Sequence, residues 1–276
     1  MLQRTLIPVF TIIYIYCIIV IVNKNQFSLY SISKRLFESA AAFVFTPICI
    51  FCGCILKSGV NTYLNTDICV DCMHTSAHSA AHADTAPSDI AYVDDAIYLF
   101  AYRGAVRKSL ARYKFGNRPS YSRTFANLLA RFLNSGYSVA HGIDMLVAVP
   151  LHAARELERG YDQAFLIARK LSEPSGIPLG RGLLLRRTGT RRQSSLSKAD
   201  RSKNVRGAFY VKRPGSVKGR SILLIDDIIT TGSTVSECAR VLKEAGAAKV
   251  AAAAVASGRK GLCVYGCLPG KGGVKK

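Results

Sequence analysis

The 276-residue chain is poor in acidic side chains and contains no P-loop. Only 17 Asp and Glu residues stand against 38 Lys and Arg residues, which gives a formal net charge of +21. Such an excess suits a polyanionic ligand or partner, for example pyrophosphate, nucleic acid or an anionic membrane face, and its sign does not choose among them. Because no G-x-x-x-x-G-K-[ST] loop is present, a Walker-type nucleotide site is excluded.

The one long apolar run covers residues 6–22, between Arg4 and Lys24, and no A-x-A-like cleavage site follows it closely. This argues against a cleaved signal peptide, and the run is at the short limit for a membrane-spanning helix. Two alternatives stay open for residues 1–32: a single membrane anchor, or an over-extended start of the chain. Under either, we expect a cytoplasmic body, tethered to the cytoplasmic membrane if the anchor is real.

Two C-x-x-C pairs, Cys49/Cys52 and Cys69/Cys72, are separated by sixteen residues. This spacing is typical of a four-thiolate zinc site. So small a segment has too little core to fold alone, and a structural zinc ion would hold it together. Disulfides or idle thiols are the alternatives, and Cys54 is a spare sulfur near the first pair. We predict a zinc ribbon over residues 33–75 and a polar linker over residues 76–90.

The stretch ILLIDDIITTGST, residues 222–234, places two acids between an apolar run and a loop of small residues. The run has no polar alternation, which predicts a parallel strand buried on both faces. Periodic apolar residues then predict a helix, with a capping box between Thr234 and Glu237 and a C-terminal cap at Gly246. A strand over residues 250–256 would complete a βαβ unit, whose loop lies where open α/β sheets bind ligands.

The chemistry of this stretch suits a phosphorylated sugar. The loop offers hydroxyl groups and backbone amides at the start of a helix, a combination that binds phosphate, through Thr230, Thr231, Gly232, Ser233 and Thr234. Asp226 and Asp227 would repel phosphate, so they must serve a metal or another part of the ligand. Carboxylates accept hydrogen bonds well from vicinal sugar hydroxyls. Together, the phosphate-binding loop and the acid pair are the groups that would bind a ribose 5-phosphate.

The chain between the cysteines and this stretch is strongly basic. We predict a strand and a long helical segment over residues 92–133, in which basic and aromatic side chains alternate. These residues could bind a phosphate backbone and stack on bases, or they could form a solvated face with packed tyrosines beneath it. A strand over residues 146–149 and a helix from near Tyr161 follow. Two short strands then flank a basic loop, which we expect to act as an active-site lid.

The acid pair and its loop resemble the motif that binds phosphoribosyl pyrophosphate (PRPP) in type I phosphoribosyltransferases. Together with the four cysteines, VPLHAARELERGYDQA at 149–164 and RRTGTRRQSSLSKADRSKNVRGAF at 186–209, they make the chain resemble the ComF/GntX family over residues 33–257. The resemblance implies a zinc ribbon followed by an α/β domain over residues 91–257, with a parallel sheet flanked by helices. It also implies an association with DNA uptake in competence. Residues 258–276 would be a basic disordered tail.

The resemblance also implies roles for individual residues. Asp226 and Asp227 would hold the ribose hydroxyls, residues 230–234 would wrap the 5-phosphate, and Mg²⁺ would accompany PRPP. Arg155 and Arg159 would face the pyrophosphate, in a segment where this chain has Asp162 and the family usually has Asn.

Arg191 and Arg201 are the candidates in the mobile loop. Two functions stay open: a phosphoribosyltransferase, and a non-catalytic PRPP sensor or single-stranded-DNA-binding adaptor of the competence machinery. No residue identifies the acceptor base or a general base.

Overall fold

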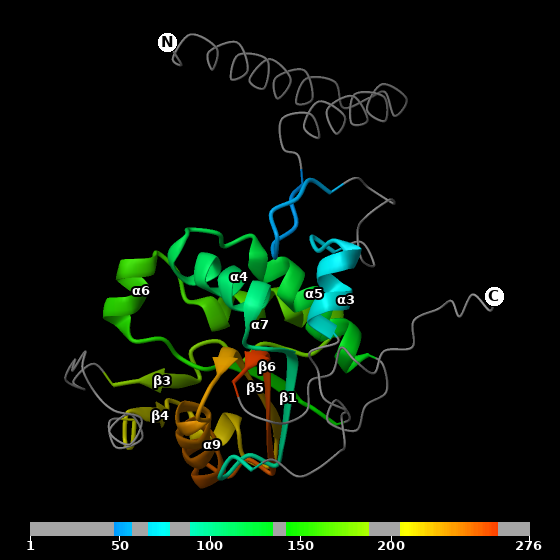
Figure 1. Ribbon diagram of the computed structural model, residues 1–276. Coiled ribbons are helices and arrows are strands. Elements are labelled where there is room, and N and C mark those ends of the chain that lie inside the picture. Colours follow the sequence, from blue (N-terminus) through cyan, green and yellow to red (C-terminus); the bar gives the residue numbers. More distant parts are fainter. Residues whose placement is uncertain (1–46, 57–65, 78–88, 135–141, 188–204, 259–276) are drawn as a thin grey trace, which may run out of the picture. The chain divides into compact units, whose positions relative to one another are not determined.

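The computed structural model describes residues 47–56, 66–77, 89–134, 142–187 and 205–258 (Figure 1). Apart from Pro47, these belong to one compact unit of the chain, residues 48–276. The apolar run at 6–22, the loop residues Arg191 and Arg201, and the tail at 259–276 lie outside the described residues. Among the described helices, none is long and apolar enough to cross a membrane.

A four-stranded parallel sheet forms the centre of this unit, in the order β1-β6-β5-β2. Its strands are β1 (Asp95–Ala101), β2 (Met145–Ala148), β5 (Ser221–Ile229) and β6 (Lys249–Ser257). The apolar residues of β5 and β6 are buried on both faces, as the lack of alternation in residues 222–225 predicted. The predicted parallel sheet is therefore confirmed, and all four strands end at one edge.

Helices and a strand pair cover the two faces of the sheet (Figure 1). One face packs against α4 (Gly104–Phe115), α5 (Tyr121–Leu133) and α7 (Gln163–Ser175). The other packs against α9 (Ser233–Glu244) and the antiparallel pair β3 (Leu184–Arg186) and β4 (Phe209–Val211). The single helical segment predicted after β1 is two helices, because α4 ends at Phe115, with Gly116 as its C-cap, and Pro119 cannot continue it.

The cysteine segment packs directly against this domain. Phe51 and Met73 belong to the same hydrophobic core as Phe100 of β1, and the rings of Phe51 and Phe100 meet edge to face at 5.3 Å. Arg112 of α4 donates hydrogen bonds from Nη2 to the carbonyl oxygens of Ile50, at 2.6 Å, and Phe51, at 2.9 Å. The second cysteine pair leads into α3 (Val70–Ala77). The cysteine segment and the sheet thus share one core.

Candidate ligand site and metal centre

The acid pair lies within β5, near its carboxyl end, because the strand continues past the predicted run as far as Ile229. Asp227 is buried, and its Oδ1 lies 2.9 Å from Nζ of Lys114, at the end of α4. Asp226 is half-buried, and its Oδ1 accepts a hydrogen bond from the backbone N–H of Asp227. Burial and the charge of Asp227 raise the pKa of Asp226 to about 8. One carboxylate is therefore compensated by a cation, whereas the other favours its protonated form.

The predicted phosphate loop joins β5 to α9 in a tight turn. Thr230 and Thr231 are exposed, and Gly232 is the N-cap of α9, with a φ of 82°. A Cβ atom at Gly232 would lie 3.0 Å from the Ile90 side chain. Left-handed backbone and a close neighbour together require glycine here. Gly232 offers no side-chain cap, and the backbone N–H of Ser233 instead donates to the Thr231 hydroxyl at 3.4 Å, which lies 3.0 Å from the Ser233 hydroxyl.

The capping box predicted between Thr234 and Glu237 is wrong. The helix begins at Ser233, so Thr234 lies inside its first turn. Glu237 is used elsewhere: its Oε1 accepts the backbone N–H of Gly207 at 2.7 Å, and it pairs with Arg240. The Gly246 cap does form, since the Gly246 N–H bonds to the carbonyl of Lys243 with a φ of 94°.

The segment proposed for the pyrophosphate side follows β2, which neighbours β5 and ends at the same edge. It forms the short helix α6 (Ala153–Arg159), on which Arg155 is exposed. Arg159 is instead engaged within the protein: its Nη1 donates to Oε1 of Gln163 at 2.7 Å, and its guanidinium lies 4.9 Å from the ring centre of Phe115. Of the two arginines predicted to face the pyrophosphate, Arg155 is therefore exposed, whereas Arg159 contacts other residues of the protein.

Asp162, which stands where the family usually has Asn, is the N-cap of α7. Its Oδ1 accepts the N–H of Phe165 at 2.9 Å, and its Oδ2 accepts the N–H of Leu151 at 3.1 Å. An asparagine has one side-chain oxygen and could not present a separate acceptor to each amide. Burial raises the pKa of Asp162. The substitution thus ties the loop after β2 to the start of α7.

Arg186 is a site residue that the sequence did not single out. It lies at the end of β3, its guanidinium is 5.3 Å from the ring centre of Phe209, and its buried Nε has no hydrogen-bond partner among the residues that the structure describes. Burial, together with the positive charge of Arg155, lowers the pKa of Arg186. Two guanidinium groups that repel each other, one with an unused donor, are suited to hold an anion between them. Only the general density of basic residues pointed to this region.

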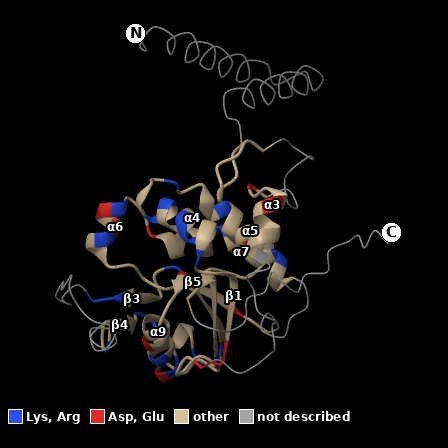
Figure 2. Cartoon of the chain, in the orientation of Figure 1, with Lys and Arg blue, Asp and Glu red and all other residues tan. Residues whose placement is uncertain are grey.

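The basic helices are partly structural. Lys114 pairs with Asp227, Arg112 binds the cysteine segment, and Arg123 lies 3.5 Å from Asp67. The tyrosines at 113 and 121 are buried, as the alternative of a solvated face with packed tyrosines beneath it predicted. Lys and Arg residues nevertheless occur on α4, α6 and β3, with acidic residues beside them on α6 (Figure 2). An anion at the carboxyl edge of β2 and β5 would lie close to them.

The four predicted metal ligands lie together. The sulfur atoms of Cys49, Cys52, Cys69 and Cys72 lie within 4.8 Å of one another, and those of Cys52 and Cys69 are 3.7 Å apart. A tetrahedral zinc ion with Zn–S bonds of about 2.3 Å spaces its sulfurs by roughly 3.8 Å. Burial and the neighbouring sulfurs raise the pKa of Cys72, so four thiolates need a cation among them. The cluster could bind structural zinc, and Cys54 is outside it.

We expect the purified protein to carry about one zinc ion per chain. Cys52→Ser should lose the zinc, whereas the matched variant Cys54→Ser should keep it. Because Cys49 and Met73 share the core of the sheet, chelation should also lower the melting temperature of the whole domain. Elemental analysis and thermal unfolding measure both effects. Zinc-free protein whose melting is unchanged by a chelator would show that the cluster is no metal site.

Comparison with known proteins places this architecture in a class. Residues 152–263, from α6 past β6, match the family model described as the phosphoribosyl transferase domain. The chain therefore carries a domain of the phosphoribosyltransferase type, and the predicted fold, with its N-terminal cysteine module, is confirmed.

Three curated relatives are similar to part of the chain. The chain is 32% identical to Competence protein F of Haemophilus influenzae over 51% of this chain and 63% of the relative. It is 32% identical to Competence protein ComFC of Bacillus subtilis, over 54% of this chain and 58% of the relative. It is 37% identical to the DNA utilization protein YhgH of Escherichia coli, over 39% and 46%. These relatives, together with the phosphoribosyl transferase domain, support the resemblance to the ComF family that its motifs predicted.

The chain thus spans 46% to 63% of the length of these three relatives. A solved structure described as the allosteric regulatory enzyme of purine biosynthesis aligns with 52% of this chain and 29% of its own, at 24% identity and a TM-score of 0.37. That likeness is too low to carry an argument.

Proposed function

We propose that the chain binds PRPP at the carboxyl edge of its sheet. The observation that supports this most is the order of groups along β5 and α9: two carboxylates, then exposed hydroxyls and a glycine turn at a helix start. The start of α9 attracts the 5-phosphate. Asp226 and Asp227 accept hydrogen bonds from the 2- and 3-hydroxyls of the ribose.

The pyrophosphate of the ligand would lie between β5 and α6, where Arg155 and Arg186 offer positive charge. We assign the pyrophosphate contact first to these two residues. Arg159 stays a third candidate, because its Nη1 is bonded to Gln163 but its buried Nε has no partner among the described residues. Mg²⁺ bound together with PRPP would neutralise further charge on the leaving group. Arg191 and Arg201 remain candidates for closing over the site.

The reaction proposed is phosphoribosyl transfer. Arg155 and Arg186 stabilise the departing pyrophosphate, and the carboxylates at β5 lie near the ribose, where positive charge develops in the transition state. A nitrogen nucleophile then bonds to C1. The proposal places the chain in the cytoplasm, where thiolates remain reduced.

Two measurements test the proposal. Calorimetry should show that PRPP binds in the presence of Mg²⁺, and that ribose 5-phosphate binds more weakly because it lacks the pyrophosphate. A pyrophosphate-release screen with purine, pyrimidine and amide acceptors should then reveal turnover. Binding of PRPP without turnover on any acceptor would favour a PRPP sensor, whereas no binding of either ligand would refute the proposed site.

A second candidate function is a single-stranded-DNA-binding adaptor of the competence machinery. The names of the relatives and the net charge of +21 favour it. A contact with about three phosphates predicts that affinity for a single-stranded oligonucleotide falls roughly 20-fold between about 50 and 200 mM salt. Fluorescence anisotropy measures this. Absent binding at low salt, or binding that ignores salt, would argue against the adaptor and leave the PRPP site untouched.

A further inference from the structure

The last turn of α4, residues 112–115, contacts both the cysteine segment and the acid pair. Arg112 binds the cysteine segment, and Lys114 binds Asp227. Residues two positions apart on an α-helix point in directions about 200° apart, so one turn can reach to two sides at once. A single piece of helix therefore lies between the cluster that could bind zinc and the proposed ribose site.

The contact with the cysteine segment is polar and involves the metal-binding turn itself. The guanidinium of Arg112 donates to two consecutive carbonyls, those of Ile50 and Phe51, and both lie between the cysteines of the first C-x-x-C pair. A metal ion held by that pair would fix the turn and, with it, the positions of both carbonyls. The acceptors of Arg112 thus depend on the state of the cysteines.

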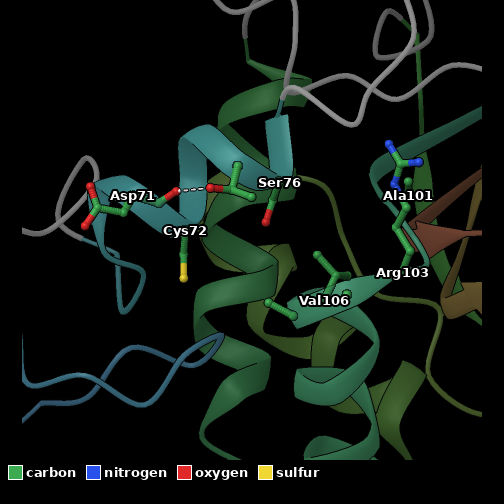
Figure 3. Close-up of a pocket in the computed structure, with 9 residues that line it drawn as sticks. Asp71, Cys72, Ser76, Ala101, Arg103 and Val106 are labelled. Carbon is green, nitrogen blue, oxygen red and sulfur yellow. Dashed lines mark hydrogen bonds between the residues drawn. The ribbon is translucent and has the colours of Figure 1, made fainter.

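At the other end of α4, a cavity of about 310 Å³ lies between this helix and α3, which carries Cys72 (Figure 3). Arg112 is about two turns further along the helix. We therefore expect a change at the cysteines to reach α4 at its last turn.

The contact with the acid pair compensates one of two neighbouring carboxylates. Nζ of Lys114 lies 2.9 Å from Oδ1 of Asp227, and the two side chains keep only 20% and 9% of their surface exposed. Burial and the charges of Asp227 and Asp162 raise the pKa of Asp226, whereas Lys114 and the N–H of Asp227 oppose this rise. The lysine therefore sets both the orientation of one carboxylate and the ionisation of the other.

The residue between the two cations limits how far the turn can move. Tyr113 has none of its surface exposed, and its hydroxyl donates to the carbonyl of Gln163 at 2.9 Å. The hydroxyl of Tyr161 in turn donates to the Tyr113 carbonyl. Loss of the Arg112 contacts should therefore shift Lys114 only slightly, with a smaller effect than the loss of Lys114 itself.

We propose that Lys114 is a positioning residue for the ribose, and that the cysteine turn controls it through Arg112, so that metal bound by the cysteines strengthens PRPP binding at β5. This inference rests on the proposed function. With the cysteine turn fixed, Arg112 holds the last turn of α4 where Lys114 meets Asp227. The carboxylate then keeps the orientation in which it accepts the ribose hydroxyls.

Three variants of the full-length, zinc-loaded protein test this role. Lys114→Met should weaken PRPP binding about tenfold, and Arg112→Gln roughly threefold, as expected for a residue that acts through another. Arg123→Gln is the matched control, because Arg123 also contacts the cysteine segment, at Asp67, but from α5, which carries no residue assigned to the ligand. Its affinity for PRPP should equal that of the parent. Calorimetry measures affinity, while metal analysis and thermal unfolding check that each variant keeps zinc and folds.

Two further readouts distinguish positioning from a packing defect. In the double variant Arg112→Gln with Lys114→Met, the loss of affinity should equal that of Lys114→Met alone, because Arg112 then has no lysine to position. The pH at which PRPP affinity rises should move upward in Lys114→Met, and by less in Arg112→Gln, because losing the cation raises the pKa of Asp226 further. Arg123→Gln should keep the pH profile of the parent.

Coupling between two sites is reciprocal, so PRPP should tighten zinc binding by the same factor by which zinc tightens PRPP binding. Competition for zinc with a chromogenic chelator, with and without PRPP, measures this factor in the parent. The effect of PRPP on zinc should shrink in Arg112→Gln and stay unchanged in Arg123→Gln.

The outcomes separate this inference from the proposed function. Losses that multiply in the double variant, or parental affinity in Arg112→Gln, would overturn the coupling through α4 and leave the PRPP site standing. Should Arg112→Gln not fold, an unchanged pH profile in Lys114→Met, or zinc binding in the parent that ignores PRPP, would contradict the inference instead. A parent that binds no PRPP would refute the proposed function itself, and the role of Lys114 with it.

Discussion

Asp227→Asn and Asp226→Asn should each weaken the binding of PRPP by tenfold or more. Both carboxylates lie on β5, separated from the phosphate loop by Ile228 and Ile229. A hydrogen bond to a charged group contributes about 1.5–3 kcal/mol, which corresponds to roughly 10- to 100-fold in affinity. Ribose 5-phosphate should lose as much as PRPP, because both ligands carry the hydroxyls that the acids would hold. Calorimetry with each ligand measures the effect.

The pH dependence should identify Asp226 separately. Since its pKa is raised to about 8, the affinity of the parent for PRPP should rise with pH as this carboxyl ionises. That rise should disappear in Asp226→Asn, and in Asp227→Asn it should move to lower pH, because the charge of Asp227 contributes to the raised pKa of Asp226. Asp144→Asn is the control, because Asp144 lies at the opposite end of β5 and binds the Ser221 N–H. An affinity that falls equally in Asp144→Asn would mean that loss of charge alone, and not the ribose, explains the result.

The sequence alone predicted the parts of the site that are contiguous in the chain. The apolar run, the acid pair and the small-residue loop share thirteen residues, so one strand and one turn suffice to place them. The cysteine cluster was predictable for a similar reason, because each C-x-x-C pair forms its own turn. Both signals depend on local geometry, which a short sequence specifies.

The partners that come from far along the chain could not be predicted. Lys114 reaches Asp227 only because α4 packs across the face of the sheet, and Arg186 approaches Arg155 only through the pairing of β3 with β4. From the sequence, the basic residues of α4 and α5 could all have belonged to one ligand-binding surface. In the structure, Arg112, Lys114 and Arg123 contact other parts of the protein. The predicted capping box did not form because the N-cap of α9 is the left-handed Gly232, two residues before Thr234. The sequence shows how many charged side chains a segment has, but not which of them form ion pairs within the fold.

Asp226→Asn and Asp227→Asn should change stability in opposite directions, although both weaken ligand binding. The pKa of Asp226 is higher in the folded chain than its unfolded value of about 3.9, so the folded chain binds this proton more tightly. The folded state therefore holds more protons between the two pKa values, and stability is lost as pH rises through the folded pKa of about 8. Asparagine removes this penalty, so near pH 8 we expect Asp226→Asn to be about 1–2 kcal/mol more stable, or roughly 2–8 °C higher in melting temperature.

Asp227→Asn should instead lower stability, because it leaves Lys114 without its partner while 20% of the lysine side chain is exposed. Breaking a fully buried pair costs about 3–5 kcal/mol, and partial exposure together with relief of the repulsion on Asp226 reduces the loss to about 1–3 kcal/mol. Lys114→Met combined with Asp227→Asn is the control, since it removes both charges and should restore most of the loss.

Thermal unfolding from about pH 4 to 8 measures all of these variants, and the gain from Asp226→Asn should vanish at the acidic end. If both single variants lose stability at every pH, the ionised carboxyl of Asp226 does not destabilise the fold, and the raised pKa assigned to it is wrong.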